Sequence, residues 1–171
     1  MSASQLALNV ALLVFVLGTN LGTRTVSRNR LLLPVVLVAV AGWFFLQDLS
    51  TSGSDARVEL AGALIGVGLG LAAGVLMPVG TDGAGRIVTT AGVGYAALWI
   101  AVIGGRIAFA YSATGWASRP VEEFSMSQQI TGAGAWTTAF VLMALTMVLT
   151  RVVVTASRVR SVAACRAELA R

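Results

Sequence analysis

The chain contains no histidine and no lysine, and its only cysteine is Cys165. Without histidine it lacks the imidazole ligands of haem and zinc and the most common general base of enzymes. One thiol cannot form an intrachain disulfide or a CxxC redox pair. These absences exclude a thiol relay within the chain, and we expect neither a metal site nor a cofactor.

Charged residues are also scarce, at 11% of 171 residues, whereas soluble domains carry about 25%. Apolar residues make up 57%, and the mean hydropathy is +0.85. They occur in long blocks, and apolar blocks of about 18 residues or more indicate transmembrane helices. We therefore predict one all-α integral membrane domain, a bundle of five transmembrane helices with a basic tail. The expected helices cover residues 5–22, 31–49, 57–77, 87–111 and 128–150, and the tail covers 151–171.

The arginines are distributed unequally between the two ends of the predicted bundle. Such a bias places the arginine-rich side in the cytoplasm, so we expect the N-terminus outside and the C-terminus inside. The net charge of +5 follows from this topology and does not indicate nucleic-acid binding. Arginine-only usage with abundant Ala, Val and Gly favours a bacterial plasma membrane. The arginine-rich side carries Arg24, Arg28, Arg30, Arg86, Arg151, Arg158, Arg160, Arg166 and Arg171, and the other side Arg57 and Arg119.

A stripe of glycines runs through the third predicted helix, in "GALIGVGLGLAAG" (62–74). Glycine is a poor helix former, but in a bilayer small residues let two helix backbones approach closely. We predict that Gly62, Gly66, Gly70 and Gly74 form a helix-packing surface. Its partner is either another helix of the same chain, which we favour, or a second copy. Small residues at 92–97 and 132–135 are candidate contacts.

Three charged residues fall near the outer ends of predicted helices. Asp48 ends the second, Glu59 begins the third, and Arg106 lies about one and a half turns from the end of the fourth. Intramembrane charges are costly and mark functional candidates. We predict that they form a polar cluster. It is either an Arg–carboxylate clasp between helices, which we favour, or a functional site or ion relay.

Two loops carry further patterns. The glycine-rich "PVGTDGAGR" (78–86) lacks the spacing and the terminal Lys of a P-loop, so we expect a plain turn. In the outer loop 112–129, Pro120 followed by Glu122 and Glu123 is a typical helix start, which predicts a short interfacial helix.

The chain resembles the CcdC-like family of small bacterial multi-pass membrane proteins. The resemblance rests on "RNRLLLP", "ELAGALIGVGLGLAAG", "TDGAGR" with "GYAALW", and "VLMALTMVLTR". It implies a multi-pass fold and no particular reaction. The family name derives from an association with cytochrome c maturation, and with one Cys and no His any such role here would be indirect.

A second, local resemblance is that of "RPVEEF" (119–124) to the Pro-x-Glu-Glu motif of membrane-embedded carotenoid cyclases. It implies that Glu122 and Glu123 would be the catalytic acids, protonating an isoprenoid double bond. Such chemistry needs a carboxyl group kept neutral in a dry site.

The leading hypothesis for function is a non-enzymatic accessory or assembly protein, because no metal set, nucleophile–base pair or nucleotide loop is present. Its partners would be the lipid bilayer and either a second copy or another membrane protein. A small oligomeric transporter or channel is the second hypothesis, and a lipid- or isoprenoid-modifying enzyme is the third. A polar lumen would favour transport, and a closed apolar cavity ending at Glu122 or Glu123 would favour the enzyme.

Overall fold

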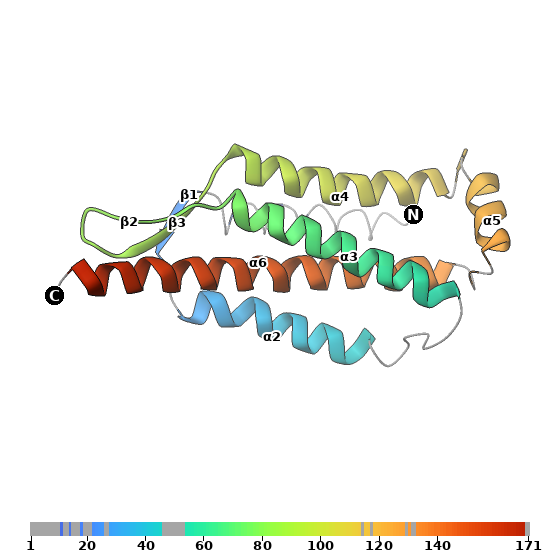
Figure 1. The fold of residues 1–171 in the computed structure, drawn as a ribbon. Helices are drawn as coiled ribbons and strands as arrows, with labels where there is room; N and C mark the ends of the chain where they lie inside the picture. Colours follow the sequence, from blue (N-terminus) through green and yellow to red (C-terminus); the bar gives the residue numbers. More distant parts are fainter. Residues whose placement is uncertain are drawn as a thin grey trace.

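The computed structural model describes residues 11, 14, 18, 22–25, 28–45, 54–113, 115–116, 118–128, 130 and 133–169. Over this part of the chain the long helices run side by side, with a small sheet and the C-terminus at one end and a short helix at the other (Figure 1). The elements in chain order are β1 (Gly22–Thr25), α2 (Arg28–Phe45), α3 (Ser54–Val75), β2 (Val79–Thr81), β3 (Ile87–Ala91), α4 (Val93–Ala113), α5 (Ser118–Ser127) and α6 (Ala133–Leu169).

Three of the described helices, α3, α4 and α6, are long and apolar enough to cross a membrane. The expected helix over 5–22 lies almost entirely outside the described residues, and its last residue, Gly22, belongs to β1. Helix α2 ends at Phe45, and the remainder of the range predicted to 49 is likewise not described. A largely helical chain with three membrane-length helices is therefore what the structure establishes.

Helices α3 and α6 form the central pair of the fold. A Cβ atom added to Gly62 would lie 2.5 Å from the carbonyl oxygen of Ala139, and one added to Gly70 would lie 2.6 Å from that of Met147. Gly66 faces the Met143 carbonyl just as closely. Because these neighbours are backbone atoms, a side chain at Gly62, Gly66 or Gly70 would push the helices apart, and at Gly74 it would meet the Val154 side chain.

The glycine stripe thus contacts a helix of its own chain, and its partner positions are not the small residues considered from the sequence. Gly94 of α4 has only the Leu76 side chain near it, and Gly68, on the other face of α3, has nothing within 4 Å. The buried face of α3 extends beyond the stripe toward the start of the helix. The buried residues of α3 are Asp55, Glu59, Gly62, Gly66, Gly70, Ala73 and Gly74.

Helix α4 packs through large side chains instead of small ones. Its buried residues, Tyr95, Trp99 and Ile103, recur every fourth position and therefore share one face. They join Ala73, Met77, Ala91 and Met147 in the main apolar core. The core therefore lies toward the sheet end of α3, α4 and α6.

The sheet is a feature that the sequence analysis missed. Residues 87–91 were expected to begin a helix, but they form β3, the central strand of an antiparallel sheet of order β1-β3-β2. Strand β2 pairs Val79 with Thr89, and β1 pairs Gly22 with Ala91. The helix prediction over 87–111 was wrong for its first turn, because "IVTTA" is rich in β-branched residues that favour strands.

The turn between β2 and β3 is organised by Asp82. Its Oδ1 accepts hydrogen bonds from the backbone amides of Ala84 and Arg86, and Oδ2 accepts one from Nε of Arg86 at 2.8 Å. The Arg86 amide is the largest influence holding the pKa of Asp82 below its usual 3.8. Gly85 adopts a φ of 74°, which L side chains rarely reach. The turn expected over 78–86 is thus a hairpin with a defined hydrogen-bond pattern.

Helix α6 begins at Ala133, later than the expected 128, and runs without interruption to Leu169. The continuation past Arg151 therefore takes up most of the predicted basic tail. At 37 residues it is about 55 Å long, well beyond the roughly 30 Å of a bilayer core. The short helix predicted in the outer loop is α5.

Candidate binding cleft

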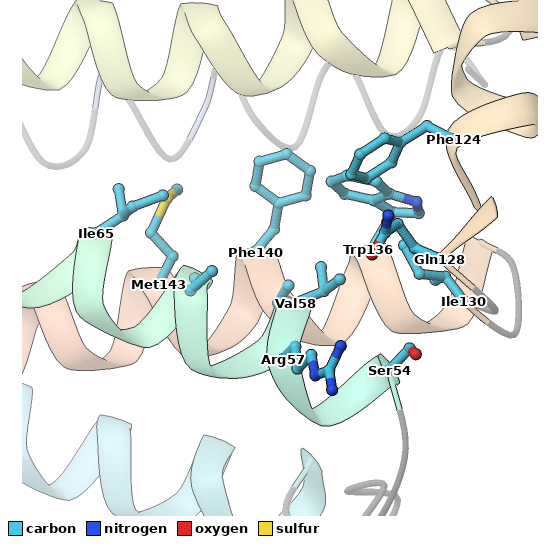
Figure 2. A pocket seen from close by; sticks show the side chains of 13 residues that line it. Ser54, Arg57, Val58, Ile65, Phe124, Gln128, Ile130, Trp136, Phe140 and Met143 are labelled. Carbon is cyan, nitrogen blue, oxygen red and sulfur yellow. The ribbon is translucent and has the colours of Figure 1, made fainter.

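A cleft of about 320 Å³ lies between α3 and α6 at the end where α5 crosses the bundle (Figure 2). We refer to it as the α3–α6 cleft. Its walls are the first three turns of α3, the first three turns of α6 and the side chains that α5 and the segment after it direct inward. The lining residues are Ser54, Arg57, Val58, Ala61, Gly62, Ile65, Phe124, Gln128, Ile130, Trp136, Ala139, Phe140 and Met143.

The spacing of these residues explains why the cleft runs along the helices. On α3 the lining positions 54, 57, 58, 61 and 65 recur at three- and four-residue intervals, and on α6 the positions 136, 139, 140 and 143 do the same. Such intervals place residues on one face of a helix. The two faces meet beside the glycine contact, since Gly62 and Ala139 belong both to the helix interface and to the cleft wall.

Aromatic side chains close one side of the cleft. The rings of Phe109 and Phe140, and of Phe109 and Trp136, have centroids 5.2 Å apart. Phe124 of α5 lies next to Trp136, with centroids 6.3 Å apart. The indole N–H of Trp136 donates to the Ser125 hydroxyl at 3.3 Å, which ties α5 to α6. An apolar ring with one polar tip is typical of residues at a membrane–water interface.

Two of the polar lining residues, Ser54 and Arg57, lie across the cleft from the aromatic rings, and the third, Gln128, lies beside Trp136. Ser54 and Arg57 come from the first turn of α3, and Gln128 directly follows α5. Arg57 and Gln128 are exposed. Figure 2 shows Arg57 and Ser54 on the opposite side of the cleft from Phe124 and Trp136. The cleft therefore has an apolar body and a polar mouth that carries one positive charge.

Glu122 and Glu123, the predicted catalytic acids, lie on α5 but not in the cleft. Both side chains are exposed, and the α5 residue that lines the cleft is Phe124. This position does not provide the dry site that protonation of a double bond would require.

The predicted polar cluster of Asp48, Glu59 and Arg106 is separated over the described residues. Glu59 is 5% exposed on the α3 face that packs on α6. Arg106 places its guanidinium over the ring of Phe140, 5.9 Å from the centroid. These two residues form no ion pair with each other, and Asp48 lies outside the described residues. Arg106 thus contacts the aromatic group beside the cleft, through a cation–π arrangement.

A second polar group lies at the sheet end. The Arg151 guanidinium donates to the hydroxyl of Tyr95 and lies 5.3 Å from the centroid of that ring. Arg158, two turns further along α6, donates to the carbonyl oxygen of Gly74 at 3.1 Å. The indole N–H of Trp99 is buried without an acceptor among the described residues. These arginines join α6 to α4 and to the end of α3.

Over the described residues, no group of three or more His, Cys, Asp or Glu side chains is arranged to hold a metal ion. The residues that sequence reasoning did not single out are Arg57, Trp136 and Phe140. A signal was present for each helix separately, in the four- and three-residue spacing of positions 54, 58 and 61 and of positions 136, 140 and 143. The sequence does not show that α3 and α6 are neighbours, or which residues of the two helices lie opposite each other.

These features define a small helical protein with three helices able to cross a bilayer and an apolar cleft at one end of its central helix pair. No family model, curated protein or solved structure matches the chain.

Proposed function

We propose that the chain is a non-enzymatic accessory or assembly protein of the bacterial plasma membrane. In this proposal it spans the bilayer five times, with the N-terminus outside and the C-terminus in the cytoplasm. The observation that carries the proposal is the lining of the α3–α6 cleft, which contains one cationic side chain and no carboxylate, thiol or imidazole. Such a lining can bind and orient an apolar molecule. Its one hydroxyl nucleophile, Ser54, has no general base beside it in the lining.

The positions of the arginines support the proposed orientation. Arg24, Arg86 and Arg158 belong to the end with the sheet and the second half of α6, whereas α5 and the start of α3 lie at the opposite end (Figure 1). Lys and Arg residues accumulate on the cytoplasmic side of membrane proteins. The sheet end is therefore assigned to the cytoplasm and α5 to the outer interface. The resemblance to the CcdC-like family agrees with a multi-pass chain of this kind.

The packing of the described helices gives less support to a transporter. The α3–α6 interface is closed by direct contact between glycines and backbone carbonyls, and the core at the sheet end is apolar. Transport sites instead lie near the bilayer midplane and are formed by broken helices. Helices α3, α4 and α6 are each continuous.

Native-membrane extraction tests the accessory role. The full chain would be extracted into polymer-bounded native nanodiscs and fractionated by size, and each fraction would be analysed by mass spectrometry. We expect another membrane protein to comigrate with it at a fixed ratio. The same material should not modify isoprenoid or phospholipid mixtures.

Migration of the chain on its own would contradict the accessory role. Turnover lost in Glu122→Gln or Glu123→Gln would replace it with the enzyme hypothesis. Solute flux in proteoliposomes would replace it with the transporter.

A further inference from the structure

We propose that the α3–α6 cleft is a binding site for one anionic phospholipid of the outer leaflet. The headgroup phosphate lies at Arg57, and one acyl chain lies along the apolar wall toward Ile65 and Met143. This inference rests on the membrane orientation given under the proposed function. It adds the class of ligand and names the residue that selects its charge.

The length and depth of the cleft fit one leaflet. From Ser54 to Ile65 the lining of α3 covers 11 residue steps, which is about 16 Å along the helix. Half of a hydrocarbon core of roughly 30 Å is about 15 Å. The polar residues of the α3 wall lie at the start of the helix, and the apolar wall extends from there along it. A lipid in this leaflet has the same order, with a polar headgroup at the surface and apolar chains below it.

The charge at the mouth favours an anionic headgroup. Arg57 lines the cleft and is exposed, Ser54 adds an uncharged hydrogen-bond donor on the same side, and Gln128 adds another across the cleft. The two nearest carboxylates on α3, Asp55 and Glu59, are buried on a different face of the helix and do not line the cleft. The positive charge of Arg57 is therefore presented to the ligand without an acidic side chain in the lining. Guanidinium groups bind phosphate oxygens in bidentate geometry.

The size and open shape of the cleft suit a narrow, flexible occupant. Cavities of about 300 Å³ are at the lower end of small-molecule sites. A single flexible chain can occupy such a space between the aromatic group and α3.

Fluorescence quenching by brominated lipids tests this site, because Trp136 lines the cleft. The probe protein is the full chain with Trp43→Phe and Trp116→Phe, which removes two exposed indoles and leaves Trp136 and the buried Trp99. It would be placed in phosphatidylcholine nanodiscs that contain increasing fractions of dibrominated phosphatidylglycerol or dibrominated phosphatidylcholine. We expect saturable quenching, with half-saturation at an about fivefold lower fraction of the anionic lipid, which is the effect of one arginine at an anionic surface.

Two matched pairs of variants identify the site. Arg57→Gln should reduce the fivefold preference to about one, whereas Arg119→Gln, which removes an exposed arginine of α5 that does not line the cleft, should leave it unchanged. Ala61→Phe fills the cleft and should abolish saturable quenching. Ala101→Phe, at an exposed alanine of α4, should not. If Ala61→Phe does not fold, Ile65→Phe, which fills the inner end of the cleft, serves the same purpose.

Equal quenching by the two lipids in the parent protein would overturn the proposal. So would identical behaviour of Arg57→Gln and Arg119→Gln, or of Ala61→Phe and Ala101→Phe. A chain that shows the anionic preference but migrates without a protein partner would defeat the accessory role alone. A chain that comigrates with a partner but shows no lipid preference would defeat this inference alone.

Discussion

Gly66, Gly68 and Gly70 share one helix and nearly one depth, but their surroundings differ. Gly66 and Gly70 face carbonyl oxygens of α6, whereas Gly68 has open space around its missing side chain. Gly66→Leu and Gly70→Leu should each lower the free energy of unfolding by about 1–3 kcal/mol or more, because backbone atoms cannot move aside as a flexible side chain can. Gly68→Leu should be neutral or stabilising by up to about 1 kcal/mol, since leucine is the better helix former. Thermal unfolding in one detergent measures all three.

Equal destabilisation by the three substitutions would show that the stripe is not a contact surface. Crosslinking in membranes provides the control. If Gly66→Leu removed a crosslinked dimer and left the stability of the monomer unchanged, the contact would be between two copies instead of between α3 and α6.

The sequence predicted the stripe but not its partner. Glycines at every fourth position form a groove along a helix whichever partner packs there. The sequence therefore identified the residues of the groove, which are Gly62, Gly66, Gly70 and Gly74. The expected complement was a set of equally small residues. In the structure the groove receives the backbone of α6 at Ala139, Met143 and Met147. At both methionines the atoms nearest the glycines belong to the backbone, and sequence alone does not show which atoms of a residue will face a neighbouring helix.

At the level of secondary structure, the main error concerned the sheet. Ile87–Ala91 is a short apolar run next to a long one, and apolarity alone does not separate a strand from a helix over five residues. Its pairing with β1 joins residues more than sixty positions apart, as in the Thr25↔Val88 pair. Such pairing depends on how the helices return to the same end of the bundle, which a local pattern does not contain.

The contact between Tyr95 and Arg151 gives a prediction about the pairing of α4 with α6. Tyr95 is fully buried, and its hydroxyl accepts a hydrogen bond from the guanidinium. Hydrogen bonds to charged groups contribute about 1.5–3 kcal/mol. Tyr95→Phe should therefore lower the free energy of unfolding by about 1–3 kcal/mol while keeping the ring in the core.

A double-mutant cycle with Arg151→Gln isolates this contact from the other interactions of Arg151. We expect a coupling free energy of about 1 kcal/mol in chemical or thermal unfolding. Additivity within about 0.3 kcal/mol would mean that the hydroxyl and the guanidinium do not stabilise one another.

For the whole molecule, the unequal arginine distribution predicts the orientation, and Cys165 offers a direct test. It is the only thiol of the chain and lies exposed on the last part of α6. A membrane-impermeant maleimide should label Cys165 only after the cells are permeabilised. In a Cys165→Ser background, Ser2→Cys should react in intact cells and Ala170→Cys should not.

Labelling at Ala170→Cys but not at Ser2→Cys in intact cells would show that the orientation is the reverse of the one proposed. It would also move the α3–α6 cleft to the cytoplasmic leaflet. Labelling of both positions from outside would require an even number of membrane crossings.

For the whole molecule, the sequence was most informative about the class of protein, a helical membrane protein, and least informative about the α3–α6 cleft. Long apolar blocks predict membrane helices because the bilayer requires about 20 apolar residues per span, independent of partners. The α3–α6 cleft depends on three segments that meet at one point, so Arg57, Phe124 and Trp136 could not be grouped beforehand. Charged residues were preferred as candidates, and Glu122 and Glu123 proved to lie on the exposed side of α5.

Helix α6 has a mechanical consequence that follows from its continuity. It contains no proline, and one unbroken run of backbone hydrogen bonds connects Trp136 beside α5 to Arg158 and Arg160 at the sheet end. Such a helix behaves as a stiff rod, so its ends cannot move independently. A tilt of only about 5° about the Trp136 end would swing the far end of a 55 Å rod by about 5 Å, the length of one helical turn. A small displacement next to the cleft is thus converted by leverage into a large one at the sheet end of the molecule.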